Sequence, residues 1–240
     1  MFVGIIKKLA DLWRNQPPKT LSEEYEKYLC SGYPSNHTYK IRNGKLSPRY
    51  KLAKRYKKIR TLFPETLTSL VEIGCSKGFF VFEASHLPSC GKSLGIDVNG
   101  YDISVCRWVK EKLQNTRATF EKMQLHTLAE QIEAFGGPFQ TVLILNTYQY
   151  LYFGSDTFFS CYLDNEKIFQ YLRKICSGRI IFNNRMELHD CQNTKPISQS
   201  GKRGKHYTEK NIVEAASRYF TVKNHGQIGK YPLLTMDVKE

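Results

Sequence analysis

The sequence lacks paired cysteines at metal-binding spacing, and near its start it lacks acidic side chains. Its seven cysteines are an odd number, and none belongs to a Cys-x-x-Cys pair. The sequence therefore indicates neither a zinc site nor a disulfide framework, and we expect no bound metal and a reducing, cytoplasmic setting. No Asp or Glu occurs between Glu26 and Glu65.

The positive charge of the chain is concentrated in its first quarter. The whole sequence has 36 Lys and Arg against 22 Asp and Glu, a net charge of +14. Residues 1–66 contain 15 of the basic and 5 of the acidic side chains. Such an excess attracts polyanions, RNA among them, or anionic membrane surfaces. A solvated basic helix is the alternative interpretation.

Residues 1–14 have the apolar spacing of a helix, and Lys7-Lys8 interrupts the apolar run that a signal peptide would need. The segment is too short to span a bilayer. We expect its apolar stripe to pack against the rest of the chain, and the alternative is peripheral membrane contact as an interfacial helix.

A second amphipathic helix is predicted from Pro48 to Pro64. Leu52, Tyr56, Ile59 and Phe63 recur at helical spacing, and Lys and Arg fall on the other faces. Residues 16–44, between the two helices, are expected to form loop or short helix. We therefore divide the chain into a basic helical extension (1–64), acting as a lid or in substrate binding, and a main domain (65–240).

Short apolar runs alternate with amphipathic segments from residue 67 onward, which is typical of an α/β fold. We expect a Rossmann-like, mostly parallel sheet of seven strands, closed by a C-terminal antiparallel hairpin. The expected strands lie near 68–74, 92–97, 117–122, 140–146, 178–183, 220–227 and 233–239, and the expected helices near 78–87, 101–115, 127–135, 164–176 and 208–219.

A ligand-binding turn is predicted at Gly74-Cys75-Ser76-Lys77-Gly78, which follows an apolar strand ending in Glu72-Ile73. Glycine at the first position lets a ligand approach the main chain closely. A second strand ends in Gly95-Ile96-Asp97, about 20 residues further on, so Asp97 is expected to accept hydrogen bonds from two ribose hydroxyls.

This pattern resembles the first motif of the class I S-adenosylmethionine-dependent methyltransferases. Ser76 stands where the middle glycine of that motif usually is. The resemblance implies S-adenosylmethionine as the cofactor, and it implies that Glu72 orders the turn or meets the methionine amino group. The implied cofactor-binding residues are Glu72, Gly74, Cys75, Ser76, Gly78, Asp97, Val98, Met123, Gln124 and Asn146.

Further family positions follow by their order along the chain. Met123 and Gln124 leave the third strand of the main domain, where the family places residues beside the adenine. Asn146 and Tyr148 leave the fourth strand, where groups face the sulfonium and the acceptor. His189 follows the fifth strand, on the expected substrate rim, and is the candidate base. Plain surface is the alternative for Met123 and Gln124, and a surface or structural role is the alternative for His189.

A nicotinamide dehydrogenase is the main competing interpretation, but its Gly-x-Gly-x-x-Gly turn is absent. Within the methyltransferases, the stretch from about Tyr50 to the end also resembles the tRNA wobble-uridine carboxymethyltransferase group. It departs from that group because Tyr50 replaces a tryptophan and no arginine follows Arg218. We therefore expect ordinary rather than carboxylated S-adenosylmethionine.

Three hypotheses about function remain open at the sequence level. In the first, weakly favoured, the acceptor is RNA such as tRNA, bound by the basic residues 40–60 with Tyr39, Tyr50 and Tyr56 as stacking surfaces. In the second, a small molecule binds under residues 1–64 as a lid, in a pocket lined by Phe79, Tyr148, Tyr150 and Tyr152. In the third, the fold is a basic, non-catalytic nucleic-acid-binding module. The oligomeric state is not predicted.

Overall fold

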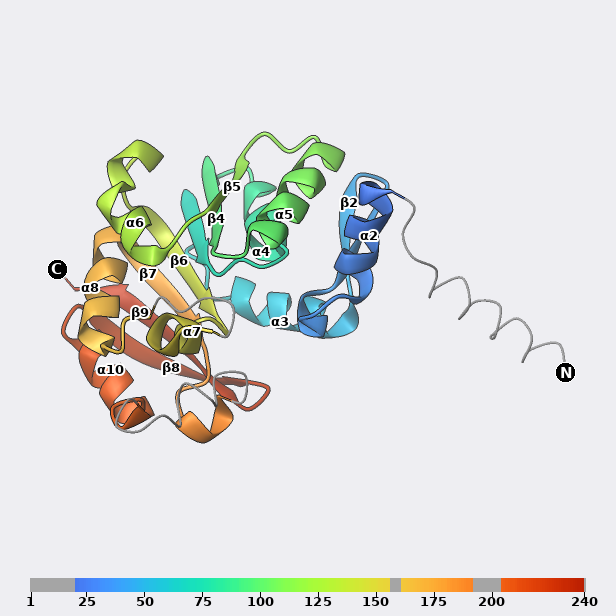
Figure 1. The fold of residues 1–240 in the computed structure, drawn as a ribbon. Coiled ribbons are helices and arrows are strands. Elements are labelled where there is room, and N and C mark those ends of the chain that lie inside the picture. The colour runs from blue at the N-terminus through green and yellow to red at the C-terminus, as the bar shows by residue number, and fades with distance from the viewer. Residues whose placement is uncertain (1–19, 156–160, 192–203, 240) are drawn as a thin grey trace, which may run out of the picture.

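A seven-stranded sheet runs through the centre of the molecule, with helices on both of its faces (Figure 1). The structure is a computed structural model that describes residues 20–155, 161–191 and 204–239. The strand order is β5-β4-β3-β6-β7-β9-β8. In chain order the strands are β3 (Ser69–Ile73), β4 (Lys92–Asp97), β5 (Ala118–Lys122), β6 (Phe139–Leu145), β7 (Cys176–Asn183), β8 (Phe220–Ile228) and β9 (Tyr231–Val238).

The first five strands of this sheet, β3 to β7, are parallel to one another, and the last two form a hairpin. β9 pairs antiparallel with β7 and with β8. The expected mostly parallel sheet with a C-terminal antiparallel hairpin is thus confirmed. The chain leaves β3 toward β4 on one side and returns to β6 on the other, and the carboxyl ends of strands at such a reversal are where α/β folds bind ligands.

Two separate hydrophobic cores cover the two faces of the sheet. One face packs against α6 (Leu125–Glu130), α8 (Asn165–Ile175) and α10 (Glu209–Ser217), and α7 (Tyr148–Phe153) joins this core. The other packs against α3 (Tyr50–Arg60), α4 (Phe79–Ser85) and α5 (Gly100–Lys112), and α2 (Leu21–Ser31) joins this core by packing against α5. Since side chains alternate along a strand, Val71 and Ile73 enter the first core, and Leu70 and Glu72 point to the second.

Side-chain caps fix the starts of several helices. Thr20 and Glu23 form a reciprocal capping box at α2, and Asn99 accepts a hydrogen bond from the Tyr101 N–H at α5. Asp164 and Thr208 cap α8 and α10 in the same way. The starts of α5, α8 and α10 lie close to where the periodicity of the sequence predicts them.

The segment before residue 64 differs from the expected loop and helices. It contains a 3-10 turn, η1 (Ser35–His37), and a small antiparallel sheet of β1 (Tyr39–Arg42) and β2 (Lys45–Pro48). Asn43 and Gly44 form its two-residue turn, both with positive φ, as such hairpins require. The expectation of loop or short helix is therefore wrong for 39–44, because the hairpin buries Tyr39 in the second core.

One expectation falls outside the described residues, and another is corrected within them. The predicted helix of residues 1–14 is outside. Arg55 was expected on a solvent face of its helix, yet it is only 5% exposed, because α3 turns that side toward the sheet.

Across the described parts of the chain, no helix is both long and apolar enough to cross a membrane.

Candidate functional site

A cavity of about 680 Å³ opens at the carboxyl ends of the parallel strands. Its floor comes from the ends of β3, β4 and β6 and from the residues that follow them. Its wall includes a segment far away in the sequence, residues 33–37 around η1. The lining residues used below are His37, Gly74, Ser76, Asp97, Val98, Asp102, Met123, Gln124, Asn146, Thr147, Gln149, Tyr150, Tyr162, Arg185 and Tyr231.

The turn after β3 brings the main chain to the cavity. Gly74 has a φ of +70°, and its N–H and that of Cys75 donate to the Ile96 carbonyl at 2.8 and 3.0 Å. A β-carbon on Gly74 would lie 2.5 Å from the side chain of Thr147. Glycine is therefore required there by both conformation and space. Ser76 also has a positive φ, 48°, in keeping with the glycine usual at its position.

Asp97 closes the turn from the neighbouring strand. Its Oδ2 accepts from the Ser76 N–H and its Oδ1 from the Asn99 N–H, both at 2.9 Å. Burial raises the pKa of this carboxyl to about 6. Each oxygen keeps a further lone pair, so Asp97 can still accept from two hydroxyls of a ligand.

The predicted residues beyond β4 and β5 also line the cavity. Val98 follows Asp97, and Met123 and Gln124 follow β5, with the Met123 N–H donating to the Asp97 carbonyl at 3.0 Å. Asp102 and Tyr162 are among the lining residues that sequence reasoning missed. Asp102, on α5, accepts from the Tyr28 hydroxyl at 2.5 Å, and the Tyr162 hydroxyl lies 3.0 Å from His126 Nδ1.

Three oxygens around the cavity are buried and have no hydrogen-bond partner. They are Ser76 Oγ, Asn146 Oδ1 and Gln149 Oε1. Gln149 donates through Nε2 to the backbone carbonyl of Asn146 at 2.8 Å, which fixes the Gln149 side chain beside Asn146. Buried acceptors without donors are rare and costly, so this group is suited to a ligand that supplies N–H or O–H groups. Sequence reasoning identified Ser76 and Asn146 but missed Gln149.

Two of the candidate catalytic residues do not line the cavity. Tyr148 is fully buried, its hydroxyl donates to Asn165 Oδ1 at 2.7 Å, and its ring packs in the first core. His189 lies on the short 3-10 turn η3 (Leu188–Asp190), and its side chain is 78% exposed. Neither side chain therefore faces the cavity, because α7 turns Tyr148 inward and η3 turns His189 to solvent, and their catalytic roles stay predictions. Asn146 is the candidate catalytic residue that does line the cavity.

Three predicted cofactor residues also lie off the cavity. Cys75 is buried beneath the turn, where its sulfur would be 2.8 Å from a β-carbon at Gly95. Gly78 has a φ of +72° and faces Phe120. Glu72 points to the second core and does not line the cavity, so its side chain is not in position to contact a methionine amino group there. Phe79 and Tyr152, expected in a small-molecule pocket, are core residues as well.

A buried polar group connects the N-terminal segment to the sheet beside the cavity. Arg55 Nη1 lies 2.8 Å from His37 Nε2, and its Nη2 donates to Asn183 Oδ1 at 3.5 Å. A guanidinium only donates, so Nε2 is the acceptor and the ring proton is on Nδ1. Burial and the charge of Arg55 hold the pKa of His37 well below its usual value. His37 is therefore a neutral donor rather than a base.

Glu72 completes this group on the sheet side. It is 1% exposed, and neither carboxylate oxygen has a hydrogen-bond partner. Burial raises its pKa well above the ordinary value, and the charge of Arg55 opposes that rise. Within the described segments, no cluster of three or more His, Cys, Asp or Glu is arranged to hold a metal ion.

The fold is that of Rossmann-like methyltransferases. No protein-family model and no curated protein sequence matches the chain. Solved structures do match, at identities that show the fold alone.

Three of these structures illustrate the similarity. The N-methyltransferase NodS from Bradyrhizobium japonicum WM9 is 14% identical, with a TM-score of 0.53 over 79% of this chain and 97% of NodS. NodS is also known in complex with S-adenosyl-l-homocysteine. The PH0226 protein from Pyrococcus horikoshii OT3 is 14% identical (TM-score 0.56; 83% and 95% covered). A structure described as an S-adenosylmethionine-dependent methyltransferase from Listeria monocytogenes is 14% identical (TM-score 0.55; 79% and 100% covered).

Proposed function

We propose that this chain is a methyltransferase that uses S-adenosylmethionine. The observation that carries the proposal is the set of groups around the cavity: the Gly74 turn, the Asp97 carboxylate and the unpartnered oxygens of Ser76, Asn146 and Gln149. The similarity to the NodS fold, which has been solved with S-adenosyl-l-homocysteine, supports the choice of cofactor.

The residues present fit this cofactor. Asp97 is placed to accept from ribose hydroxyls, and Met123 and Leu125 offer apolar contacts for an adenine. The unpartnered oxygens suit the ammonium of the methionine part, since an ammonium has three donors and no acceptor. When bound, S-adenosylmethionine supplies an electrophilic methyl group. The chain itself then has to orient an acceptor and exclude water, which can provide most of the catalysis.

Calorimetry with three ligands tests this proposal. The protein is titrated with S-adenosylmethionine, S-adenosylhomocysteine and NAD⁺. We expect both sulfur compounds to bind with micromolar dissociation constants and NAD⁺ to show no measurable binding. Binding of NAD⁺ alone would favour the dehydrogenase, and no binding of any of the three would favour the non-catalytic module.

A small-molecule acceptor is favoured by the wall of the cavity. Residues 33–37 line it, so the N-terminal segment encloses the space beyond the cofactor, as a lid would. The exposed stacking surfaces expected for RNA are reduced, because Tyr39 is fully buried and Tyr56 packs against Phe79 and Phe80. Tyr50, 78% exposed, remains available.

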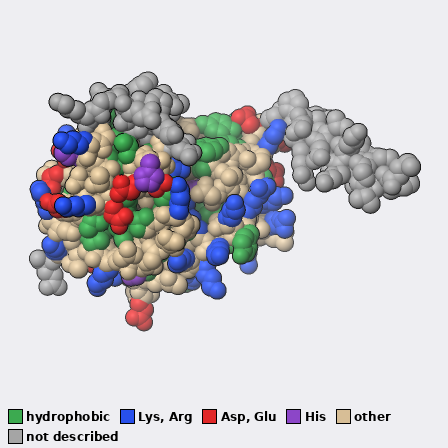
Figure 2. Space-filling view, turned by 90° about the horizontal axis from the view of Figure 1, so that it is seen from below, with side chains coloured by type: hydrophobic (Ala, Val, Ile, Leu, Met, Phe, Trp, Pro, Cys, Tyr) green, Lys and Arg blue, Asp and Glu red, His purple; other side chains and the backbone are tan. Residues whose placement is uncertain are grey.

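RNA is the second candidate, favoured by the basic surface of the N-terminal segment. Lys and Arg gather on the part of the molecule that carries β1, β2 and α3 (Figure 2). Phosphate neutralisation by such a surface would make binding steeply salt-dependent. The exposed side chains are Lys40, Arg42, Lys45, Arg49, Lys51, Lys54, Lys57, Lys58 and Arg60.

Charge reversal separates the two acceptors. The test variant is Lys51→Glu/Lys54→Glu/Lys57→Glu on α3, and the matched control is Lys167→Glu/Lys174→Glu/Lys210→Glu on α8 and α10. If RNA is the acceptor, tRNA binding at low salt falls at least tenfold in the test variant only. If wild type shows no tRNA affinity at low ionic strength, the RNA candidate is eliminated.

A further inference from the structure

Arg185 is the one cationic side chain among the described residues that line the cavity. It lies two residues beyond β7, whose end pairs with the end of β6 at Asn183 and Leu145. β7 is two strands away from β3, which is about 10 Å at the usual spacing of strands. Arg185 is therefore on the acceptor side of the cavity, away from the turn at Gly74.

The guanidinium of Arg185 is held in place but not neutralised. Its Nε donates to the Tyr231 hydroxyl at 3.0 Å, and its charge lies 5.6 Å from the centre of that ring. Tyr207 donates to the Arg185 carbonyl at 2.5 Å, which fixes the backbone. Nη1 is buried and has no hydrogen-bond partner, and in the described part of the chain no carboxylate pairs with Arg185.

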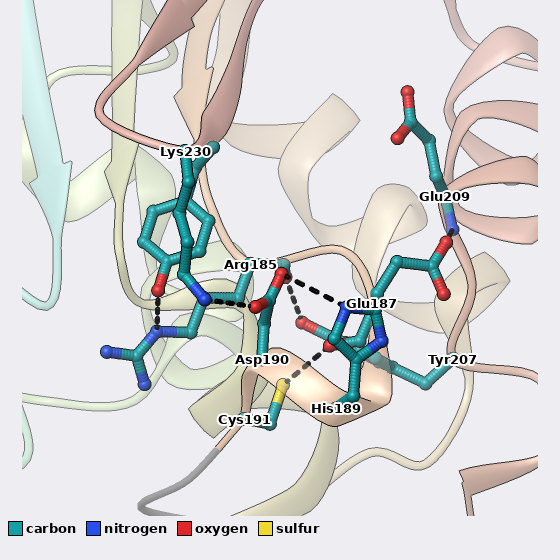
Figure 3. A network of polar contacts seen from close by, with 9 residues as sticks. Arg185, Glu187, His189, Asp190, Cys191, Tyr207, Glu209 and Lys230 are labelled. Carbon is teal, nitrogen blue, oxygen red and sulfur yellow. Dashed lines mark hydrogen bonds and ion pairs between the residues drawn. The ribbon is translucent and has the colours of Figure 1, made fainter.

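The nearby carboxylate of Asp190 is already engaged. Lys230 donates to its Oδ1, and His189 Nε2 lies 3.9 Å from its Oδ2. Figure 3 shows Asp190 between Lys230 and His189, with the guanidinium of Arg185 directed away from this group. A guanidinium has five donors in a planar fork that matches two oxygens of one anion. Arg185 uses Nε within the protein, and its Nη1 has no hydrogen-bond partner among the described residues, so the guanidinium can still donate to a ligand.

We propose that Arg185 binds a carboxylate or phosphate group of a small acceptor molecule. That the bound anion is a methyl acceptor rests on the proposed methyltransferase function. The anion site itself rests on Arg185 and Tyr231 alone. The two ends of the cavity then differ in charge: Asp97 and Asp102 line the cofactor end, and Arg185 lines the acceptor end. An anionic acceptor would be drawn to the end where Arg185 lies and kept away from the two carboxylates.

NMR titration with simple anions tests the site. Inorganic phosphate and benzoate are each added to the free protein and to protein saturated with S-adenosylhomocysteine, and backbone and arginine Nε–H signals are followed. We expect dissociation constants on the order of 1 mM, because a small anion held by a single arginine binds weakly. Arg185→Gln should weaken the affinity for whichever anion binds by at least tenfold and leave the affinity for S-adenosylhomocysteine unchanged. Arg107→Gln, an exposed arginine on α5 paired with Glu121, is the control.

Two further variants refine the assignment. Arg185→Lys keeps the charge but loses the fork, so benzoate binding should fall more than phosphate binding. Tyr231→Phe removes the hydroxyl that positions Nε, and binding should weaken about threefold while the Arg185 Nε–H signal shifts. Comparing the phosphate and benzoate arms identifies which anion the site prefers.

The outcomes are separable from those of the proposed function. The anion site is refuted if neither probe binds wild type, if Arg185→Gln binds them unchanged, or if Arg185→Gln weakens only tRNA binding. If S-adenosylhomocysteine fails to bind while the anions bind through Arg185, the methyltransferase proposal falls and the anion site stands. Thermal unfolding of each variant identifies losses that come from misfolding.

Discussion

The two ends of the cavity are built in different ways. At the cofactor end, Gly74, Ser76, Asp97 and Met123 come from the ends of adjacent parallel strands and hold one another through backbone hydrogen bonds. At the end that we propose for the acceptor, Arg185 follows β7. His37 of the N-terminal segment is linked to the end of the same strand only through side chains, because Arg55 lies between His37 and Asn183. The comparison shows that the fold itself organises one end, whereas specific side chains organise the other.

The largest effect should come from removing the connection between the N-terminal segment and the sheet. Arg55→Met takes the donor from His37 and Asn183 and the neighbouring cation from Glu72. Breaking a buried charged group of this kind typically costs about 3 kcal/mol of stability. Denaturant unfolding measures it, with Lys54→Met, exposed on the same helix, as control.

A double variant tests the physical reason. If Glu72 is destabilised by the loss of a cation, Arg55→Met/Glu72→Leu should recover part of the lost free energy. Equal stability of the single and double variants would show that the charge of Arg55 does not act on Glu72.

Asp97→Ala should act at the cofactor end alone. Loss of two charge-assisted hydrogen bonds is expected to weaken S-adenosylhomocysteine binding about 100-fold, since about 3 kcal/mol corresponds to two such bonds. Calorimetry measures the affinity, and Glu121→Ala, at an exposed carboxylate on β5, is the control. An affinity within threefold of wild type would remove Asp97 from the site.

Gly74→Ala should disturb the contact between the turn after β3 and the Thr147 side chain after β6. Its β-carbon would lie 2.5 Å from the Thr147 side chain, and we expect a loss of about 2 kcal/mol in stability. Gly44→Ala has almost the same φ and nothing within 4 Å, so it reports backbone strain alone, about 1 kcal/mol. Gly74→Ala/Thr147→Ala should relieve the clash, and equal losses in Gly74→Ala and Gly44→Ala would show that the clash is absent.

The smallest expected effect is a pH dependence specific to the cofactor end. Burial raises the pKa of Asp97 to about 6, so the carboxylate is protonated as pH falls through that value. Only the deprotonated form accepts from both ribose hydroxyls, so affinity for S-adenosylhomocysteine should fall about tenfold between pH 7 and pH 5. Asp97→Asn should bind weakly but equally at both. A wild-type affinity that stays constant would contradict this role.

The cofactor end could be predicted from the sequence because its signals are local. Apolar runs mark strands buried on both faces, and Gly74 and Asp97 occupy the ends of two of them. The hairpin at 39–48 had a local signal too, since Asn43-Gly44 is the preferred two-residue turn, but short flanking strands with many lysines obscure it. The burial of Tyr39 and Arg55 had no signal, because both side-chain types are normally exposed in part.

By itself, the sequence determined the order of strands and helices, the mostly parallel sheet and the turn at Gly74, because periodicity and backbone demands are written into neighbouring residues. Only the tertiary structure decided that Tyr148 and Glu72 turn into the cores and that His189 turns to solvent. It also decided that His37, Gln149 and Arg185 share one cavity. The physical reason is that these placements depend on which distant segments pack against each strand end, and no local pattern encodes that packing.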